Sequence, residues 1–195
     1  ISQYDVTTHD EAAKTFTLNN TVPHDFVLGD IVIACDYFQG SLFQVSGVAG
    51  NVISHAAVGN PGNSTANLGF GGNAYAFSDH STLSRINATQ WYVGANGRPG
   101  GGRSLFRNTL RATAGVPAMD VEEVAEGVRD LQITYLLRSG TVYVNAAVVT
   151  AAVRWNEVKA VRIAMTVEGN DFAGTNGQRL NRNIIQTINL RNRNP

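Results

Sequence analysis

Residues 128–137 read VRDLQITYLL, and residues 141–144 read TVYV. Alternate residues of an extended chain point to one side, and on the first run that side is apolar. It carries Leu131, Ile133, Tyr135 and Leu137. The intervening residues 138–140, Arg-Ser-Gly, suit a tight turn. We therefore predict an antiparallel hairpin, the clearest one in the chain.

Two further strands are predicted after this hairpin. Residues 145–152 form an Ala- and Val-rich bridge that fits one or two helical turns. Residues 155–167 then alternate, and their half-buried face carries Val161, Ile163, Met165 and Val167. Residues 183–191 form the last strand, and we expect Ile184, Ile188 and Leu190 to point inward. The block from Gly127 to Arg193 is thus predicted to be strand-rich.

The first half of the chain contains one comparable hairpin pattern. Residues 26–35 read FVLGDIVIAC, with Ile31, Ile33 and Cys35 on one face of an extended chain. Residues 38–41 read FQGS and suit a turn. Residues 42–45 can then return antiparallel, which would place Phe43 and Val45 on the same side.

The middle of the chain is dominated by loop and turn signals. Residues 59–73 are rich in Gly and Asn and lack apolar periodicity, which predicts a long surface loop. Residues 90–93 (QWYV) and 104–107 (SLFR) flank a Gly-rich turn and predict a second hairpin. Asp120 can cap a short helix whose capping box Glu123 completes, and Gly127 would end that helix.

Composition points to the same fold class. With 195 residues, 43% of them hydrophobic, the chain can bury one sizeable core, so we expect one domain. Only 15% of the residues are charged and 20 are glycines, a mix that favours short strands and tight turns over surface helices. We predict a mainly β protein with antiparallel sheets, one or two short helices and long Gly- and Asn-rich loops.

The charges are divided unevenly between the two halves. Residues 1–84 carry one base and seven acids, whereas residues 85–195 carry fourteen bases and eight acids. The balances of −6 and +6 cancel, so the whole chain has no net attraction for nucleic acid or anionic membrane. Either the charges interleave when the halves pack, or they form a dipole that orients stacked subunits.

Catalysis, a metal and a cofactor all lack sequence support. The four histidines lie among loops and turns without the close spacing of a zinc site, and we interpret them as exposed. They are His9, His24, His55 and His80. Residues 168–177 offer oxygen ligands, but their spacing departs from an EF-hand. The basic tail could touch DNA phosphates, although no aromatic residues accompany its arginines.

Cys35 is the only cysteine. It is either a small buried hydrophobe or half of a disulfide whose partner lies outside these residues. The start at Ile1 resembles neither a signal peptide nor an initiator methionine, which suggests a trimmed fragment. No run of about 18 apolar residues could span a bilayer.

Several phrases, taken in order, resemble the PilW family of type IV pilus minor pilins. They are GDIVI (29–33) followed by Cys35-Asp36, FQV (43–45), QWYVG (90–94), SLFR (104–107), EGVRDLQITY (126–135), WNEVKAVRI (155–163) and TINLRNR (187–193). The resemblance covers about residues 26–193. It implies that residues 1–195 form a single pilin-like globular domain, a truncated α+β pilin fold. Residues 1–25 would be a remnant after a removed N-terminal helix.

The resemblance also implies a function. A PilW-like minor pilin would prime pilus assembly within a tip complex, supporting twitching motility and adhesion, and would not be an enzyme. Its partners would be other minor pilins and the major pilin. The inner membrane would anchor the missing helix, and the assembled protein would reach the pilus fibre and cell surface from a periplasmic pool. DNA or a host surface as a partner has no support beyond the features above.

Five residues are candidates for structural or interface roles under this resemblance. Trp155 would anchor the core of the C-terminal sheet, and Arg162 and Arg191 would form surface or interface pairs; Cys35 and Arg193 complete the set. Two other classes remain open: a type II secretion pseudopilin, and a surface adhesin or DNA-contacting module without catalysis. A carbohydrate-binding module would use Trp91, Tyr92 or the Gly- and Asn-rich loops, and a secreted enzyme would need a pocket of titratable groups.

Overall fold

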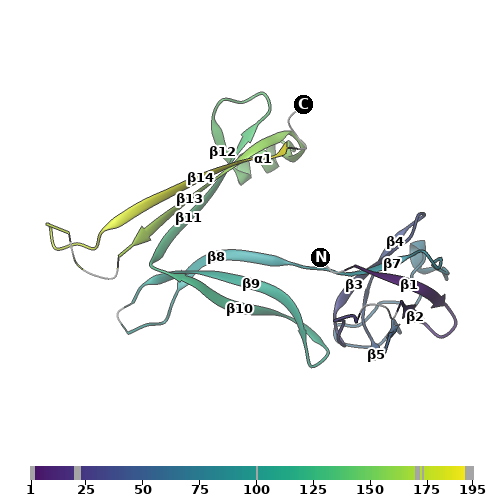
Figure 1. Ribbon diagram of the computed structural model, residues 1–195. Coiled ribbons are helices and arrows are strands. Elements are labelled where there is room, and N and C mark those ends of the chain that lie inside the picture. Colours follow the sequence, from purple (N-terminus) through teal and green to yellow (C-terminus); the bar gives the residue numbers. More distant parts are fainter. Residues whose placement is uncertain (1–2, 20–22, 100, 170–171, 173, 192–195) are drawn as a thin grey trace. The chain divides into compact units, whose positions relative to one another are not determined.

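The computed structural model describes residues 3–19, 23–99, 101–169, 172 and 174–191. Over these residues the fold is mainly β with antiparallel sheets, as the composition predicts, and it contains three sheets, one α-helix and two short 3-10 helices (Figure 1). The chain forms two compact units. The first comprises residues 1–90 and 108–121, and the second comprises residues 91–107 and 122–195.

A seven-stranded sheet with the order β4-β3-β7-β1-β2-β6-β5 makes up most of the first unit. Its strands are β1 (Gln3–Asp10), β2 (Thr15–Leu18), β3 (Ile31–Cys35), β4 (Gly40–Gln44), β5 (Gly47–Ala49), β6 (Val52–Ser54) and β7 (Thr82–Arg85). Consecutive strands pair as the hairpins β1–β2, β3–β4 and β5–β6, and β7 lies between β1 and β3. Val32 faces Phe43 across β3 and β4, which confirms the first predicted hairpin.

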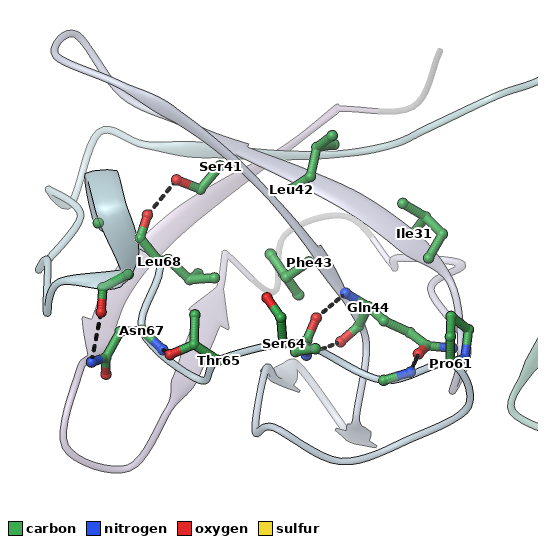
Figure 2. A pocket seen from close by; sticks show the side chains of 14 residues that line it. Ile31, Ser41, Leu42, Phe43, Gln44, Pro61, Ser64, Thr65, Asn67 and Leu68 are labelled. Carbon is green, nitrogen blue, oxygen red and sulfur yellow. Dashed lines mark hydrogen bonds between the residues drawn. The ribbon is translucent and has the colours of Figure 1, made fainter.

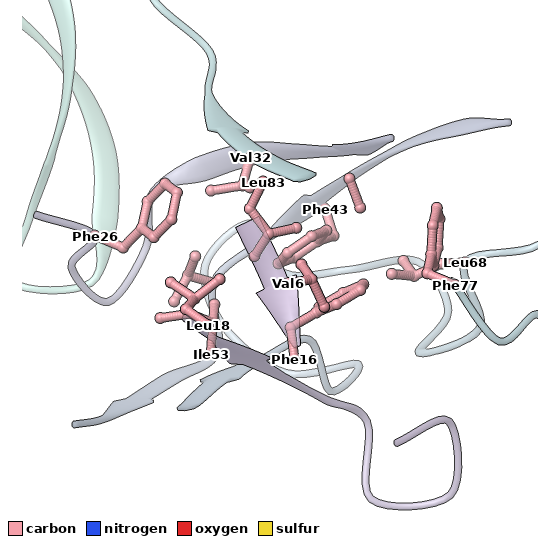
Figure 3. Packing of buried hydrophobic residues seen from close by; sticks show 12 residues of the cluster. Val6, Phe16, Leu18, Phe26, Val32, Phe43, Ile53, Leu68, Phe77 and Leu83 are labelled. Atoms are coloured by element: carbon pink, nitrogen blue, oxygen red, sulfur yellow. The ribbon is translucent and has the colours of Figure 1, made fainter. Parts of the chain in front are cut away.

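The core of the first unit combines four phenylalanines with eight aliphatic residues (Figure 3). The rings of Phe16 and Phe43 stack with their centroids 5.6 Å apart, and aliphatic side chains surround them. On β3 Ile31, Ile33 and Cys35 share one half-buried face, as predicted, whereas Val32 and Ala34 on the other face are fully buried. Alternation predicts which residues of a strand share a face, but it does not say which face is buried. On β3 the buried face is that of Val32, because its cross-strand partner Phe43 lies in the core.

Residues 59–73 form the predicted loop, whose one regular element is the 3-10 helix η1 (Phe70–Gly72). Two side chains hold the loop against β4, as Figure 2 shows. The Asn63 amide accepts a hydrogen bond from Gln44 N at 2.6 Å and donates to Gln44 O at 2.9 Å. The Gln44 side chain donates to Asn60 O and accepts from Gly62 N. This loop is therefore fixed by hydrogen bonds along its length.

We expect Gly29→Ala to lower the free energy of unfolding by about 2–4 kcal/mol. Gly29 has φ +91°, and an added Cβ would lie 2.5 Å from the backbone C and O of Gly115. Gly50 also has a positive φ, +59°, but nothing lies within 4 Å of its Cβ position. Gly50→Ala should therefore cost only the backbone strain, about 1 kcal/mol. Urea unfolding of both variants measures the difference, and equal losses would contradict the close approach of Gly29 to Gly115.

A three-stranded sheet with the order β10-β9-β8 contributes residues to both units. Its strands are β8 (Thr89–Ala95), β9 (Arg103–Thr113) and β10 (Val116–Glu126). β8 and β9 are hydrogen-bonded neighbours in this sheet, which agrees with the second predicted hairpin. The helix predicted from Asp120 is wrong, because these residues belong to β10. There Asp120 and Glu122 pair with Arg111 and Arg107 of the neighbouring strand, so cross-strand pairing overrides the local capping signal.

The second unit contains a four-stranded sheet with the order β12-β11-β13-β14. Its strands are β11 (Val128–Leu137), β12 (Tyr143–Asn145), β13 (Val158–Glu168) and β14 (Asn181–Asn189). The predicted β11–β12 hairpin is confirmed, with Tyr135 opposite Val144. The predicted bridge contains the helix α1 (Ala146–Ala151), whose N-cap Asn145 accepts from Val148 N, and the 3-10 helix η2 (Trp155–Glu157) follows it.

A small core lies where α1 packs in the second unit. Val149 of α1 is fully buried with Leu137 and Val158. Trp155 is 41% exposed and contacts Tyr135, which packs against this core. Every residue of β14 is also exposed, so the inward direction predicted for Ile184 and Ile188 is wrong. β14 is an edge strand, and its side chains extend beyond the part of the sheet that α1 reaches.

Within the described ranges, no helix has the length and apolar character needed to cross a membrane. The expectation that residues 1–195 act as one pilin-like domain stays a prediction.

Candidate functional site

One face of the C-terminal sheet is almost entirely apolar. Directly paired residues of an antiparallel sheet point to the same side. Three cross-strand rows result, Tyr135–Val161–Ile188, Ile133–Ile163–Gln186 and Leu131–Met165–Ile184. We call the eight apolar members of these rows the apolar face. The rows on the other side of the sheet are mainly polar: Thr134–Arg162–Thr187, Gln132–Ala164–Ile185 and Asp130–Thr166–Asn183.

The lower part of the apolar face forms a shallow hollow of about 280 Å³. It is lined by Trp91 and Leu105 of β8 and β9 together with Leu131, Ile133, Ile163 and Met165. These six residues carry no titratable group, so the hollow is suited to binding an apolar partner and not to acid–base chemistry. Ile133, Ile184 and Ile188 are each about two-fifths exposed. Neighbouring exposed isoleucines on one sheet face indicate an interaction surface.

A second hollow, of about 490 Å³, lies at the end of the same face near α1. Its lining includes Tyr135, Trp155 and Arg191. The Trp155 ring meets the Tyr135 ring edge-on, with centroids 4.9 Å apart, and its Nε1 donates to Thr150 Oγ1 at 3.1 Å. Trp155 is thus held in a fixed orientation at the rim of the apolar face.

The other predicted site residues lie apart from this face. Arg162 is on the polar side of β13, where its guanidinium stacks on the Tyr143 ring at 3.7 Å. Cys35 is a half-buried free thiol on β3, opposite Gly40. Arg193 lies outside the described residues. The structural or interface roles of Cys35, Trp155, Arg162, Arg191 and Arg193 stay predictions, as do both interpretations of Cys35.

A polar cluster in the first unit was missed by the sequence patterns. It contains His9, Glu11, Lys14, His55 and Asn67. The interpretation of all four histidines as exposed is wrong for two of them, because the side chains of His9 and His55 are 0% exposed. Residues 46 positions apart come together here, and no local spacing reports such a contact. The sequence feature that could have drawn attention to this cluster is the scarcity of lysine, because Lys14 is one of only two lysines in the chain.

Hydrogen bonds assign the protons of the histidine pair. His9 Nδ1 accepts from Phe77 N at 3.0 Å, so the neutral ring carries its proton on Nε2. His55 Nδ1 lies 3.0 Å from Ala66 O and must donate to it, which leaves His55 Nε2 as an acceptor. The two Nε2 atoms are 3.0 Å apart and form one hydrogen bond, donated by His9. The pair is thus satisfied in its neutral form.

A metal ion fits this cluster poorly. His9, Glu11 and His55 each offer a ligand atom, and these atoms lie within 4.8 Å of one another. Binding through His9 Nε2 would require a lone pair on that atom. Because His9 Nδ1 accepts a hydrogen bond from Phe77 N, the proton of a neutral His9 is on Nε2, which then has no such lone pair. The hydrogen-bond pattern therefore favours a neutral histidine pair over a metal centre.

We expect stability to fall as the pH falls below about 6.5. Burial, reinforced by His9, lowers the pKa of His55 from 6.5 to about 4, and burial also lowers the pKa of His9. Above pH 6.5 His55 is neutral in both states; between pH 6.5 and about 4 only the unfolded chain takes up the proton. The pKa difference corresponds to about 3 kcal/mol lost by pH 4. Urea unfolding over this range measures the loss.

A control for this pH dependence is available within the chain. His80 is exposed, so His80→Ala should keep the wild-type slope of stability against pH. His55→Gln should flatten the slope between pH 6.5 and about 5. An unchanged slope in His55→Gln would contradict the role of the buried ring.

Ion pairs within the described parts of the chain join the two oppositely charged halves at one residue, Arg85. It contacts Asp25 and Asp30 of the acidic half. The other arginine pairs recorded there use acids of the basic half, as in Arg98–Glu123 and Arg129–Glu168. Ion pairs between the acidic residues 1–84 and the basic residues 85–195 therefore neutralise little of the charge difference between these two halves.

Comparison with known proteins gives one match. The sequence model of a family described as "Type IV Pilus-assembly protein W" (PilW) matches residues 90–192. This range includes β9 to β14 and every strand of the apolar face. Neither a curated protein nor a solved structure gives a significant match.

Proposed function

The chain belongs to the PilW family of type IV pilus-assembly proteins, and on that premise we propose that it is a structural minor pilin whose apolar face is its assembly surface. Membership gives it a role in type IV pilus assembly, an association with the pilus and cell surface, and interaction with other pilus components. PilW is a family of pilus-assembly proteins, and the six residues that line the hollow on the apolar face carry no titratable group.

The observation that carries the proposal is the amphipathic C-terminal sheet. Its two sides differ sharply, with Ile133, Ile163 and Met165 on one and Gln132, Arg162 and Thr166 on the other. Half-exposed isoleucines gain free energy when a partner covers them, at roughly 25 cal/mol per Å². We propose that another pilin covers this face in the fibre, and that an N-terminal helix, which the family resemblance implies, anchors the protein in the inner membrane before assembly.

The place of the protein within the pilus is proposed from the same apolar face. We propose that the protein joins other minor pilins in a complex that primes the pilus, contacts the major pilin, and remains at the fibre tip, where it supports twitching motility and adhesion. The loop at residues 59–73 is suited to an outer surface because the hydrogen bonds of Asn63 hold it to β4. The balances of −6 and +6 would orient neighbouring subunits head to tail.

Co-purification tests the assembly role. The full-length protein, with its N-terminal helix, is expressed with the other minor pilins of its own system at low and high salt. We expect association at both salts, weaker at high salt if the charge split orients the subunits. A deletion strain should lose surface pili by more than about tenfold and recover them on complementation. Absence of association at either salt, together with normal piliation, would refute the proposal.

A further inference from the structure

Three side chains in the first unit are placed as reactants for a covalent bond. Lys14 lies in the turn between β1 and β2, and Asn67 lies in the loop of residues 59–73. Lys14 Nζ donates to Asn67 Oδ1 at 2.7 Å and also to Glu11 Oε1. The amine is therefore hydrogen-bonded to the carboxamide oxygen, next to the carboxamide carbon, and a carboxylate lies beside it. An amine, a carboxamide and a proton carrier are the groups that amide exchange requires.

Each of the three groups is held in place. Lys14 adopts φ +58°, which is uncommon for a residue other than Gly, and its carbonyl accepts from His55 N at 2.9 Å. The Asn67 amide nitrogen donates to Gly72 O at 3.1 Å (Figure 2). This hydrogen bond fixes the carboxamide, whose oxygen accepts from Lys14 Nζ. Glu11 Oε2 is buried and has no hydrogen-bond partner among the described residues. A buried oxygen without a partner marks a group poised for a further interaction.

The surroundings limit access of water. The side chains of Lys14 and Glu11 are 24% and 18% exposed. The His9 ring, 0% exposed, stacks on Phe16 with centroids 4.1 Å apart and meets Phe77 edge-on. The amine and the carboxylate therefore lie in a partly dry site beside packed aromatic rings.

We propose that Lys14 and Asn67 form an intramolecular isopeptide bond, with Glu11 as the proton carrier. The Lys14 ammonium passes one proton to Glu11, and the neutral amine attacks the Asn67 carboxamide carbon. The new bond joins Lys14 Nζ to this carbon, and the bond from the carbon to Asn67 Nδ2 breaks. The Glu11 carboxyl protonates the leaving nitrogen, which is released as ammonia. Lys14 Nζ, now an amide nitrogen, gives up its second proton to this ammonia, which leaves the site as ammonium. No oxidant, reductant or metal is consumed.

Lys159, the second lysine of the chain, makes an ordinary hydrogen bond and serves as a comparison for this site. Lys159 Nζ donates to the backbone carbonyl of Arg138 at 3.1 Å and not to a side-chain carboxamide, so attack there would have no ammonia to release. The inference concerns the first unit alone and does not depend on the pilus role. It adds a covalent link between the β1–β2 turn and the residue-59–73 loop, which the hydrogen bonds of Asn63 already hold to β4.

Intact mass spectrometry of the denatured full-length protein is the primary test. We expect the wild-type protein to be lighter than its sequence by one ammonia. Proteolysis should give a branched peptide that joins Lys14 to Asn67, with no cleavage after Lys14. Tandem spectra locate the bond, because cyclisation of an asparagine to a succinimide also releases ammonia but leaves Lys14 unmodified. A wild-type protein without this branched peptide would overturn the proposal.

Variants separate the chemistry from the fold. Glu11→Gln keeps the side-chain size and should fold without losing ammonia, and Lys14→Arg should also keep the full mass. Lys159→Arg should lose ammonia as the wild type does. Loss of the cross-link should lower the Tm by roughly 10 °C in Glu11→Gln, because the closed loop constrains the unfolded chain. A Lys14→Arg variant that still loses ammonia from Asn67, or a Glu11→Gln variant with the cross-link intact, would refute the bond or the role of Glu11 respectively.

Discussion

Ile184→Asp should prevent incorporation into pili while leaving the isolated protein as stable as the wild type. Ile184 lies on the apolar face, opposite Met165, and is 44% exposed. An exposed position tolerates the change within about 0.5 kcal/mol of unfolding free energy. If an apolar partner covers the face in the fibre, the carboxylate must be buried there, which costs at least about 3 kcal/mol. That cost corresponds to more than a hundredfold weaker packing.

The adjacent residue supplies a matched control for this experiment. Ile185 pairs with Ala164, points to the polar side of the sheet and is 63% exposed. Ile185→Asp makes the same chemical change one residue away and should retain pilus incorporation. Surface pili are counted by electron microscopy, and co-purification with the partner pilins is measured in parallel. Equal behaviour of the two variants would show that the apolar face is not an assembly surface.

Arg85→Met should lower the free energy of unfolding by about 3 kcal/mol or more. Asp30 is 5% exposed, and its Oδ2 accepts from Arg85 Nε at 2.9 Å and from Val27 N at 2.9 Å. Removing the guanidinium leaves a buried carboxylate with only the backbone donor. Arg85 Nη1 also binds Asp25 at 2.9 Å, so the same change frees the segment before β3. Urea unfolding of the variant measures the loss.

Two further variants show whether the buried charge is the cause. Asp30→Asn in the Arg85→Met background removes the unpaired charge and should recover part of the lost stability. Arg111 pairs with Asp120 at 3.4 Å, and both side chains are about two-thirds exposed, so Arg111→Met should cost less than about 1 kcal/mol. A loss in Arg111→Met as large as that in Arg85→Met would point to a general effect of removing arginine.

Local periodicity predicted the elements whose partners are close in the sequence. The hairpins β3–β4 and β11–β12 join runs separated by turns of a few residues, so alternation and turn residues were sufficient. The helix at Asp120 was wrongly predicted because its acids serve Arg107 and Arg111 on the neighbouring strand, and a capping rule contains no information about that strand.

Tertiary contacts account for what the sequence could not predict. Alternation groups Ile184 with Ile188 but does not say whether their side of β14 is covered, and the structure leaves both exposed. The polar cluster depends on loops that bring Lys14 to Asn67 and His9 to His55, pairs 53 and 46 residues apart. Such separations are set by the packing of the whole first unit. The ordered phrases of the C-terminal block, by contrast, suggested the family that the comparison identified.

The position of β7 has a consequence for the folding kinetics of the protein. β7 is the last strand of the first-unit sheet in the chain, yet it lies between β1 and β3, pairing Leu83 with both Tyr4 and Ala34. The hairpins β1–β2 and β3–β4 can form early from local contacts, but until β7 arrives each presents an unpaired edge. Closing this loop of about 80 residues is an entropically costly, non-local event, and such events slow folding. A chain that is released from its N-terminus onward therefore cannot complete this sheet until residue 85 is free, and its open edges need protection from other chains during that interval.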